Sequence, residues 1–116
     1  MTYQLSWHIP DQVLTLDISG EYTLNEAEAV NTIVGRELKQ VKRPITIIID
    51  ATHMERPHNF QELRAAQNYM HHRYLDHIMV ASDDKVIKLA MMIIFNMSRA
   101  YFTVVDSVDQ ALTQIQ

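Results

Sequence analysis

The stretch that most constrains the fold of this chain is PITIIIDAT, residues 44–52. From Ile45 to Ile49 the residues are apolar or β-branched, without the alternation of a strand that has one face in water. Both faces of this strand should therefore be covered, which is typical of a central strand in a helix-flanked parallel sheet. Asp50 and Thr52 follow, at the end of the strand where α/β sheets place their binding crevices.

The rest of the chain predicts alternating strands and helices around this strand. Alternating residues over 3–9 and 12–18, separated by Pro10-Asp11, predict an antiparallel hairpin. Thr23-Leu24-Asn25-Glu26 predicts a capping box that opens a helix, and Pro44 should stop that helix. The remaining predicted elements are a loop at 51–58, a helix capped by Asn59 with Glu62, a strand at 77–81, a helix at 84–98 capped by Ser82 or Asp83, a strand at 101–105, and a closing helix with the capping box Ser107 to Gln110.

This order, ββαβαβαβα, predicts an α/β fold. The helices between strands imply right-handed crossovers and a mixed, mostly parallel sheet of about five strands, with an N-terminal antiparallel hairpin and four helices. A length of 116 residues suits a single domain over residues 1–116.

Composition narrows the classes of function. The net charge of −4 gives no electrostatic footprint for nucleic acid, and two glycines leave no Gly-rich phosphate loop. The absence of cysteine excludes thiolate metal sites and a cysteine nucleophile, and it fits a reducing compartment. The N-terminus lacks the pattern of a signal peptide, and no apolar run is long enough for a transmembrane segment. We therefore expect a cytoplasmic protein.

Residues 86–97, VIKLAMMIIFNM, contain only two polar residues, Lys88 and Asn96. A helix on one sheet face needs a single apolar stripe, but two are present here. The first consists of Val86, Leu89, Ala90, Ile93 and Met97, and the second of Ile87, Met91 and Ile94, widened by Met92 and Phe95.

Three interpretations of this helix stay open. It could be buried between the sheet and another helix of the same chain, or it could form a subunit contact in a homo-oligomer. It could also border a groove for an acyl chain or another small apolar ligand, helped by adaptable methionines. The residues expected at such a ligand or oligomer surface are Met91, Met92, Ile94 and Phe95.

The polar loop after the central strand is the other candidate site. Its carboxylates and imidazoles, with His71 and His72 further along, are residue types that bind zinc, but no HExxH motif is present, so we predict no metal and no cofactor. Thr52 and Ser82 lack a nucleophile elbow, so we predict that the chain is not an enzyme. The residues predicted to form a partner-binding surface are Asp50, Thr52, His53, Glu55, Arg56, His58 and Asn59.

The segments TLNEAEAVNTIV, PITIIIDAT, HIMVASDDKVIKLAMMIIF and YFTVVDSVDQALTQI together resemble the STAS and SpoIIAA-like group, including its STAS/SEC14 branch. The resemblance implies a SpoIIAA-like fold. Antagonist members of this group carry a D-x-S motif at the strand end, then a phosphorylated serine where the next helix begins. Asp50-Ala51-Thr52 resembles the first motif, but His58-Asn59-Phe60 stands at the second without a hydroxyl. Thr52 is the fallback acceptor.

The sequence thus predicts a non-catalytic STAS/SpoIIAA-like binding domain, a regulatory protein-interaction module that lacks the phosphorylatable serine. The alternative is a module that binds a small apolar ligand or lipid through helix 86–97. We expect a protein partner or self-association in the first case, and self-association is compatible with the second.

Overall fold

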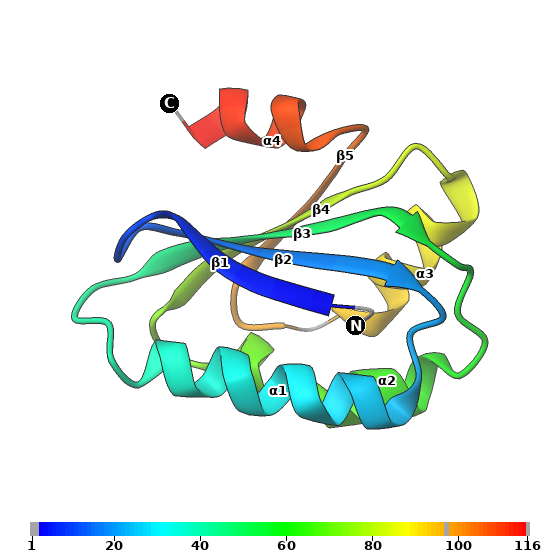
Figure 1. The fold of residues 1–116 in the computed structure, drawn as a ribbon, viewed down its shortest axis with the longest axis horizontal. Helices are drawn as coiled ribbons and strands as arrows, with labels where there is room; N and C mark the ends of the chain where they lie inside the picture. The colour runs from blue at the N-terminus through cyan, green and yellow to red at the C-terminus, as the bar shows by residue number, and fades with distance from the viewer. Residues whose placement is uncertain (1–2, 97, 116) are drawn as a thin grey trace.

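The computed structural model describes residues 3–96 and 98–115, and within them five strands form one sheet in the order β1-β2-β3-β4-β5 (Figure 1). β1 pairs antiparallel with β2, and the other neighbours pair in parallel, which confirms the predicted mixed α/β sheet with an N-terminal hairpin. The elements are β1 (Tyr3–Ile9), β2 (Val13–Gly20), α1 (Leu24–Leu38), β3 (Ile45–Met54), α2 (Phe60–Ala66), the 3-10 helix η1 (Asn68–His71), β4 (Leu75–Ala81), α3 (Lys85–Ile94), β5 (Tyr101–Val105) and α4 (Val108–Ile115).

The central position of β3 explains its unbroken run of isoleucines. Ile47 and Ile49 point into the larger core, which the sheet shares with α1, α2 and α3. Ile48 points to the opposite face, where it packs in a smaller core with Ala111 of α4. Helices lie below the sheet and α4 lies above it in Figure 1. Both faces of the strand are therefore covered, as its lack of alternation predicts.

Several element boundaries differ from the prediction. β3 continues to Met54 although a polar loop was predicted from residue 51, because β2 offers Ser19 and Gly20 as partners for His53 and Met54. The helix predicted after Asn59 ends at Ala66 and is followed by η1.

At other termini the elements also stop or start earlier than predicted. α1 ends at Leu38, well before Pro44, and β4 begins at Leu75. α3 ends at Ile94 rather than near residue 98, since Phe95 takes the C-cap position. Met97, which was assigned to one apolar stripe, lies outside the described residues.

Local hydrogen bonds confirm the first capping box and modify the second. Thr23 Oγ1 accepts from the Glu26 N–H at 3.3 Å, and the Glu26 carboxylate accepts from the Thr23 N–H at 3.3 Å. Ser107 Oγ accepts from the Gln110 N–H at 3.2 Å as predicted, but the Gln110 side chain accepts from the Asp106 N–H, at 2.8 Å, instead of from Ser107. Both helices thus begin with side chains that satisfy N–H groups their own backbones leave unpaired.

A buried polar network, which joins the connection between β2 and α1 to the junction of α2 and η1, was not predicted. The Gln67 side chain, only 2% exposed, accepts from the Tyr22 hydroxyl at 3.0 Å and from the Tyr69 hydroxyl at 2.8 Å. Its amide nitrogen donates to the Leu63 carbonyl at 3.0 Å. Burial, together with the nearby Glu26, raises the pKa of Tyr22, and burial raises that of Tyr69. Each hydroxyl is therefore held in its neutral, donating form.

Candidate functional site

Four connections leave the sheet at the carboxyl ends of its parallel strands (Figure 1), and the first, residues 21–23, follows β2. Residues 55–59 follow β3, residues 82–84 follow β4, and residues 106–107 follow β5. The Ser82 N–H donates to the Val105 carbonyl at 3.0 Å, which joins the connection after β4 to the end of β5. The edge where a binding crevice was predicted therefore carries a connected set of loops.

Asp50, Thr52 and His53 form a hydrogen-bonded cluster near the end of β3. Asp50 Oδ1 accepts from the Thr52 hydroxyl at 2.6 Å and from the Thr52 N–H at 3.1 Å. Thr52 Oγ1 lies 3.2 Å from His53 Nδ1. The register between β2 and β3 shifts in this stretch, from Asp17 opposite Asp50 to Ser19 opposite His53. The Asp50 carboxylate thus accepts a hydrogen bond from the Thr52 backbone N–H in the irregular part of the strand.

The direction of these bonds decides what the cluster can do chemically. An ionised carboxylate only accepts, so the Thr52 hydroxyl donates its proton to Asp50. His53 then faces a lone pair of Thr52 and must donate to it. An activated hydroxyl would instead donate to the imidazole of a general base. The cluster therefore directs the Thr52 hydroxyl toward Asp50 and not toward His53, and it fixes the shape of the strand end.

An ion pair ties the loop after β3 to the start of α3. Arg56 Nε lies 3.0 Å from Asp84 Oδ2, while Asp84 Oδ1 accepts from the Val86 N–H at 2.8 Å and the Ile87 N–H at 3.4 Å. The hydrogen bond from Arg56, helped by these N–H groups, lowers the pKa of Asp84. Asp84 is thus the cap of α3, which corrects the prediction of Ser82 or Asp83.

The residue Ser82 has a supporting part in this turn. Its hydroxyl, fully buried, accepts from the Asp84 N–H at 3.1 Å. The sequence around Ser82 contains no nucleophile elbow, and in the structure the Ser82 oxygen holds the capping residue in place.

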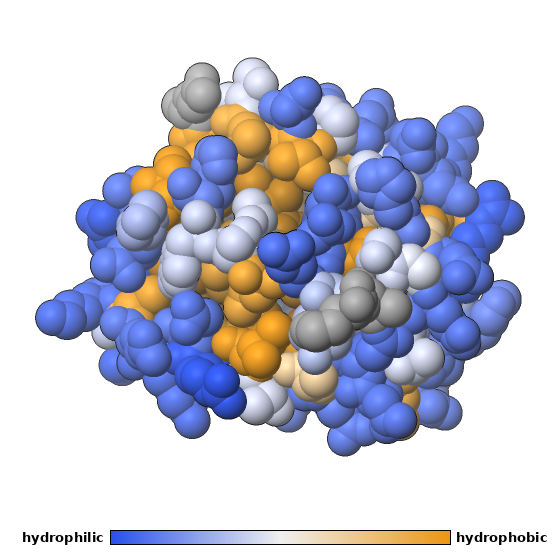
Figure 2. Space-filling view, viewed as in Figure 1, coloured by the Kyte–Doolittle hydropathy of each residue, from blue (hydrophilic) through white to orange (hydrophobic). Residues whose placement is uncertain are grey.

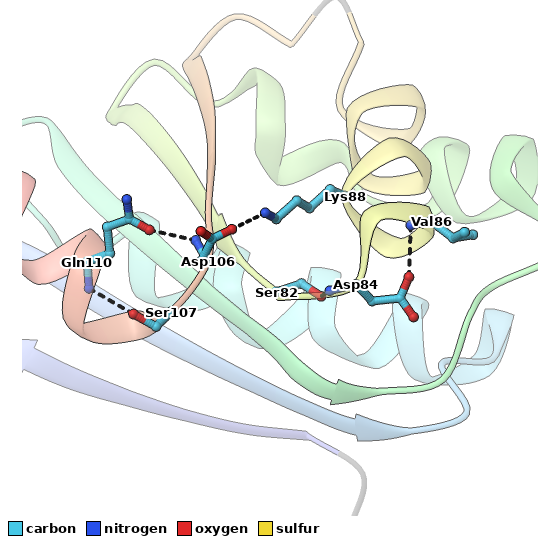
Figure 3. A network of polar contacts seen from close by, with 7 residues as sticks. All are labelled: Ser82, Asp84, Val86, Lys88, Asp106, Ser107 and Gln110. Carbon is cyan, nitrogen blue, oxygen red and sulfur yellow. Dashed lines mark hydrogen bonds and ion pairs between the residues drawn. The ribbon is translucent and has the colours of Figure 1, made fainter.

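A second ion pair joins α3 to the connection before α4 (Figure 3). Lys88 pairs with Asp106, whose N–H donates to Gln110. Figure 3 shows two separate groups of contacts, one from Ser82 through Asp84 to Val86 at the start of α3, and one from Lys88 through Asp106 to the start of α4. The edge of the sheet is thus rimmed by charges of both signs on both sides of α3.

The seven residues predicted as a partner-binding surface fall in two places. Arg56, His58 and Asn59 line a cavity of about 230 Å³ against the connection between β2 and α1. Asn59 stands at the N-cap position of α2, but its side chain makes no capping hydrogen bond, contrary to the prediction. Glu55 is exposed beside them.

Asp50 borders a different hollow, on the α4 side of the sheet. This cavity of about 280 Å³ has a polar floor that includes Thr15 and Asp17, and Val108 of α4 forms part of its wall. Figure 2 shows apolar side chains gathered beside and beneath α4 on this face of the molecule. α4 has only eight residues, so it covers only part of this face. Asp50 and Arg56 therefore border different cavities.

The predicted apolar surface of α3 is corrected by the burial of its residues. Met91, Ile94 and Phe95 lie in the core, at most 2% exposed, and of the four predicted residues only Met92, 49% exposed, lies at the surface. The helix is also not enclosed between the sheet and another helix. Large apolar side chains are exposed on its outer face at Val86, Leu89, Met92 and Ile93.

The histidines do not gather into a metal site. Among residues 3–96 and 98–115, no three His, Asp or Glu side chains are arranged to hold a metal ion. His53 belongs to the cluster at the end of β3, and His71 and His72 lie with η1, against α1. Likewise, no helix in the described part of the chain is both long and apolar enough to cross a membrane.

No protein-family model and no curated protein matches this sequence. Among solved structures, the chain is similar to an uncharacterised protein of the DUF3478 family with a SpoIIAA-like fold, from Shewanella loihica PV-4. The TM-score is 0.71 at 15% identity, over 98% of this chain and 92% of that one. The chain has a SpoIIAA-like fold. This confirms the fold that the resemblance implied.

A second SpoIIAA-like structure agrees over the whole chain. The anti-sigma factor antagonist SpoIIAA, in its unphosphorylated form, matches with a TM-score of 0.63 at 11% identity. The match covers 97% of this chain and 95% of that one. The SpoIIAA-like arrangement therefore extends from the hairpin to α4.

Proposed function

We propose that this chain is a non-enzymatic protein-binding domain of regulatory type, and that its partner binds the outer face of α3 together with the loops beside it. The observation that carries the proposal is the exposure of four large apolar side chains on one short helix. Val86 is 43% exposed, Leu89 58%, Met92 49% and Ile93 41%. Their spacing of three and four residues places them together on the helix surface.

The fold itself does not need these side chains. Ile87, Ala90, Met91 and Ile94 already fill the space between α3 and the sheet, all at most 3% exposed. Full burial of one large apolar side chain stabilises a complex by about 2 kcal/mol, so four on one face can supply much of the binding energy of a protein interface.

The surroundings of this face suit a protein partner better than a lipid. Ion pairs at both margins, Arg56 with Asp84 and Lys88 with Asp106, supply a polar border of mixed charge. Protein interfaces commonly combine an apolar centre with a polar rim. The likeness in fold to SpoIIAA, an anti-sigma factor antagonist, supports a protein-interaction role as well.

We also propose that the start of α2 is not regulated by phosphorylation. Asn59 and Phe60 stand there, and neither has a hydroxyl that a kinase could modify. The Thr52 hydroxyl donates a hydrogen bond to Asp50 at 2.6 Å, which makes Thr52 a poor acceptor of a phosphoryl group. We infer that partner binding responds to contact with the loop of residues 55–59 and α3, and not to a phosphoserine.

A substitution on the α3 face tests the proposal. The immobilised domain and its Leu89→Glu variant are exposed to extract from the source cells, and bound proteins are quantified by mass spectrometry. The matched control is Ile9→Glu, which places the same charge at another exposed apolar residue, 36% exposed and in β1. A specific partner should bind the wild type and Ile9→Glu equally, and should be lost from Leu89→Glu.

Two loop variants, Asp50→Ala and His58→Ala, measure the contribution of the predicted polar surface. If partners remain bound to Leu89→Glu, α3 is not part of the binding site. If none of these substitutions changes partner binding, the proposal is overturned. Circular dichroism of each variant checks that the fold is retained.

The alternative function, binding of a small apolar ligand or lipid, rests on the same exposed side chains of α3. None of the five cavities named for residues 3–96 and 98–115 is lined by an α3 residue, and in this alternative we place the apolar ligand on the helix surface. Native mass spectrometry of protein purified from cells tests this alternative, because a retained lipid or a second copy of the chain would appear as added mass.

A further inference from the structure

A separate pocket lies on the helical side of the sheet, between the second half of α1 and η1. Its volume is about 640 Å³, within the range of small-molecule sites. Six of the residues that line it are Asn31, Gly35, Arg36, Lys39, His71 and His72. None belongs to α3 or to the loops at the carboxyl edge of the sheet, so a ligand in this pocket would be independent of the proposed function.

The charge of this pocket is opposite to that of the whole chain. The net charge of the chain is −4, yet no Asp or Glu lines the pocket, while the cationic residues Arg36 and Lys39 are part of its lining. Within residues 3–96 and 98–115, no ion pair or side-chain hydrogen bond joins either of these groups to another protein group. Two cations on one helix face repel each other, and an anion between them would relieve that repulsion.

Two polar side chains of the lining are oriented so that they can offer donors. Asn31 Oδ1 accepts from the Tyr69 N–H at 3.0 Å, which leaves the Asn31 amide NH₂ for another partner. His72 Nδ1 accepts from the Tyr74 N–H at 3.1 Å, so in the neutral ring the proton is on Nε2. Backbone groups thus occupy the acceptors of both residues, and donors remain.

The nearby end of α1 favours cations, which offers a purely structural reason for Arg36 and Lys39. The carbonyl end of a helix carries about −0.5 elementary charge, however, and the two side chains carry +2 between them. The excess of positive charge persists after the helix end is counted.

Gly35 keeps the pocket open at the α1 surface. A Cβ placed on Gly35 would meet no atom within 4 Å, so packing does not require a glycine here. A glycine inside a helix lowers stability by about 1 kcal/mol relative to alanine. The absence of a side chain at this position therefore has a cost to the fold and leaves space in the pocket.

We propose that the pocket between α1 and η1 binds a small organic phosphate monoester. The guanidinium, ammonium and amide groups can donate hydrogen bonds to the several oxygens of a phosphate group. A carboxylate has only two oxygens and would pair with fewer of these donors. The volume of about 640 Å³ leaves room for an organic group beside the phosphate.

The test uses phenyl phosphate as the probe and amide NMR as the readout, at constant ionic strength. The amides of Gly35, Arg36, Asn68 and His71 should shift in a saturable way with phenyl phosphate, and should not shift with phenol. Shifts that are spread over the whole surface, or that chloride reproduces at the same ionic strength, would show general ion pairing and overturn the proposal.

Two variants address the pocket directly. Arg36→Gln combined with Lys39→Gln should weaken binding at least about tenfold, because each charged hydrogen bond lost is worth more than a factor of ten. Lys42→Gln combined with Arg43→Gln removes the same charge from exposed residues outside the pocket lining, and should change the affinity by less than about twofold. Equal weakening by both pairs would overturn the proposal.

Gly35→Leu separates binding from folding. The leucine should take up space at the α1 wall of the pocket and weaken the shifts, while the helix gains stability from the loss of a glycine. Unchanged binding in Gly35→Leu would place the ligand elsewhere. Vesicles of phosphatidylcholine with phosphatidic acid distinguish the source of the phosphate, because co-sedimentation that requires Arg36 and Lys39 would indicate a lipid headgroup and refute a small soluble ligand.

Discussion

The buried side chain of Gln67 gives a prediction whose size can be worked out from its contacts. We consider Gln67→Leu, which keeps a side chain of similar bulk and removes every polar atom of it. The hydroxyls of Tyr22 and Tyr69 then lose their shared acceptor, and the Leu63 carbonyl loses the Gln67 amide. No water can reach the site easily, since Gln67 is 2% exposed and both tyrosines are 3% exposed.

A buried donor left without a partner costs about 1–3 kcal/mol. Two such hydroxyls, partly offset by the apolar leucine, should reduce the free energy of unfolding by about 3 kcal/mol. That is a large fraction of the stability of an ordinary domain, about 5–15 kcal/mol. Urea unfolding followed by circular dichroism should show a midpoint lower by about 2 M.

The control that isolates the mechanism is the triple variant Tyr22→Phe, Tyr69→Phe and Gln67→Leu. Here no hydroxyl is left unpaired, and replacing both members of a hydrogen bond by apolar groups is nearly neutral. The triple variant should therefore be more stable than Gln67→Leu alone, although it carries three changes. The reasoning is refuted if Gln67→Leu loses less than about 0.5 kcal/mol, or if the triple variant is less stable than the single one.

Three further predictions concern stability. Gly35→Ala should raise the free energy of unfolding by about 1 kcal/mol and the thermal midpoint by about 4 °C, and a lower midpoint in a melting curve would contradict the open space around Gly35. Because the pKa values of Tyr22 and Tyr69 are raised above 10.0 in the fold, the unfolded chain loses these protons first, so stability should fall as pH rises past 10.0. Urea unfolding at about pH 9 and about pH 11 checks this, and Tyr22→Phe should show a smaller loss than the wild type. Asp84→Ala removes both the cap of α3 and the ion pair with Arg56, whereas Asp84→Asn keeps an oxygen for the cap. The urea midpoint of unfolding should therefore fall further for Asp84→Ala than for Asp84→Asn. Equal midpoints for the two variants would argue against the cap. Since the pKa of Asp84 is lowered, its contribution should be present near neutral pH and be lost as pH falls through that lowered pKa.

The parts of the fold that could be predicted are those decided by neighbouring residues. The isoleucine run of β3 has a pattern that only a strand covered on both faces explains, and the capping box of Thr23 with Glu26 involves residues three apart. The order of strands and helices then limits the sheet to few topologies.

The parts that could not be predicted depend on contacts between distant residues. β3 extends to Met54 because β2 supplies partners there, and the sequence from residue 51 is polar enough to suggest a loop. Gln67 is polar and lies between two helical segments, so nothing local indicates that Tyr22, far away in the sequence, would bury it. The pocket beside Gly35 has the same origin, because α1 and η1 meet only in the folded chain.

The rotation of α3 was the hardest feature to predict, and it bears most directly on function. Its two apolar stripes are chemically alike, so periodicity cannot say whether Ile87 or Leu89 faces the sheet. The structure selects Ile87, Met91 and Ile94 for the core and leaves Leu89, at 58% exposure, on the surface. A helix that only had to cover a sheet would be stable with polar residues at the outer positions. The stripe that contains Val86, Leu89 and Ile93 therefore has no role in covering the sheet, and its exposure is the reason why we propose a partner on α3.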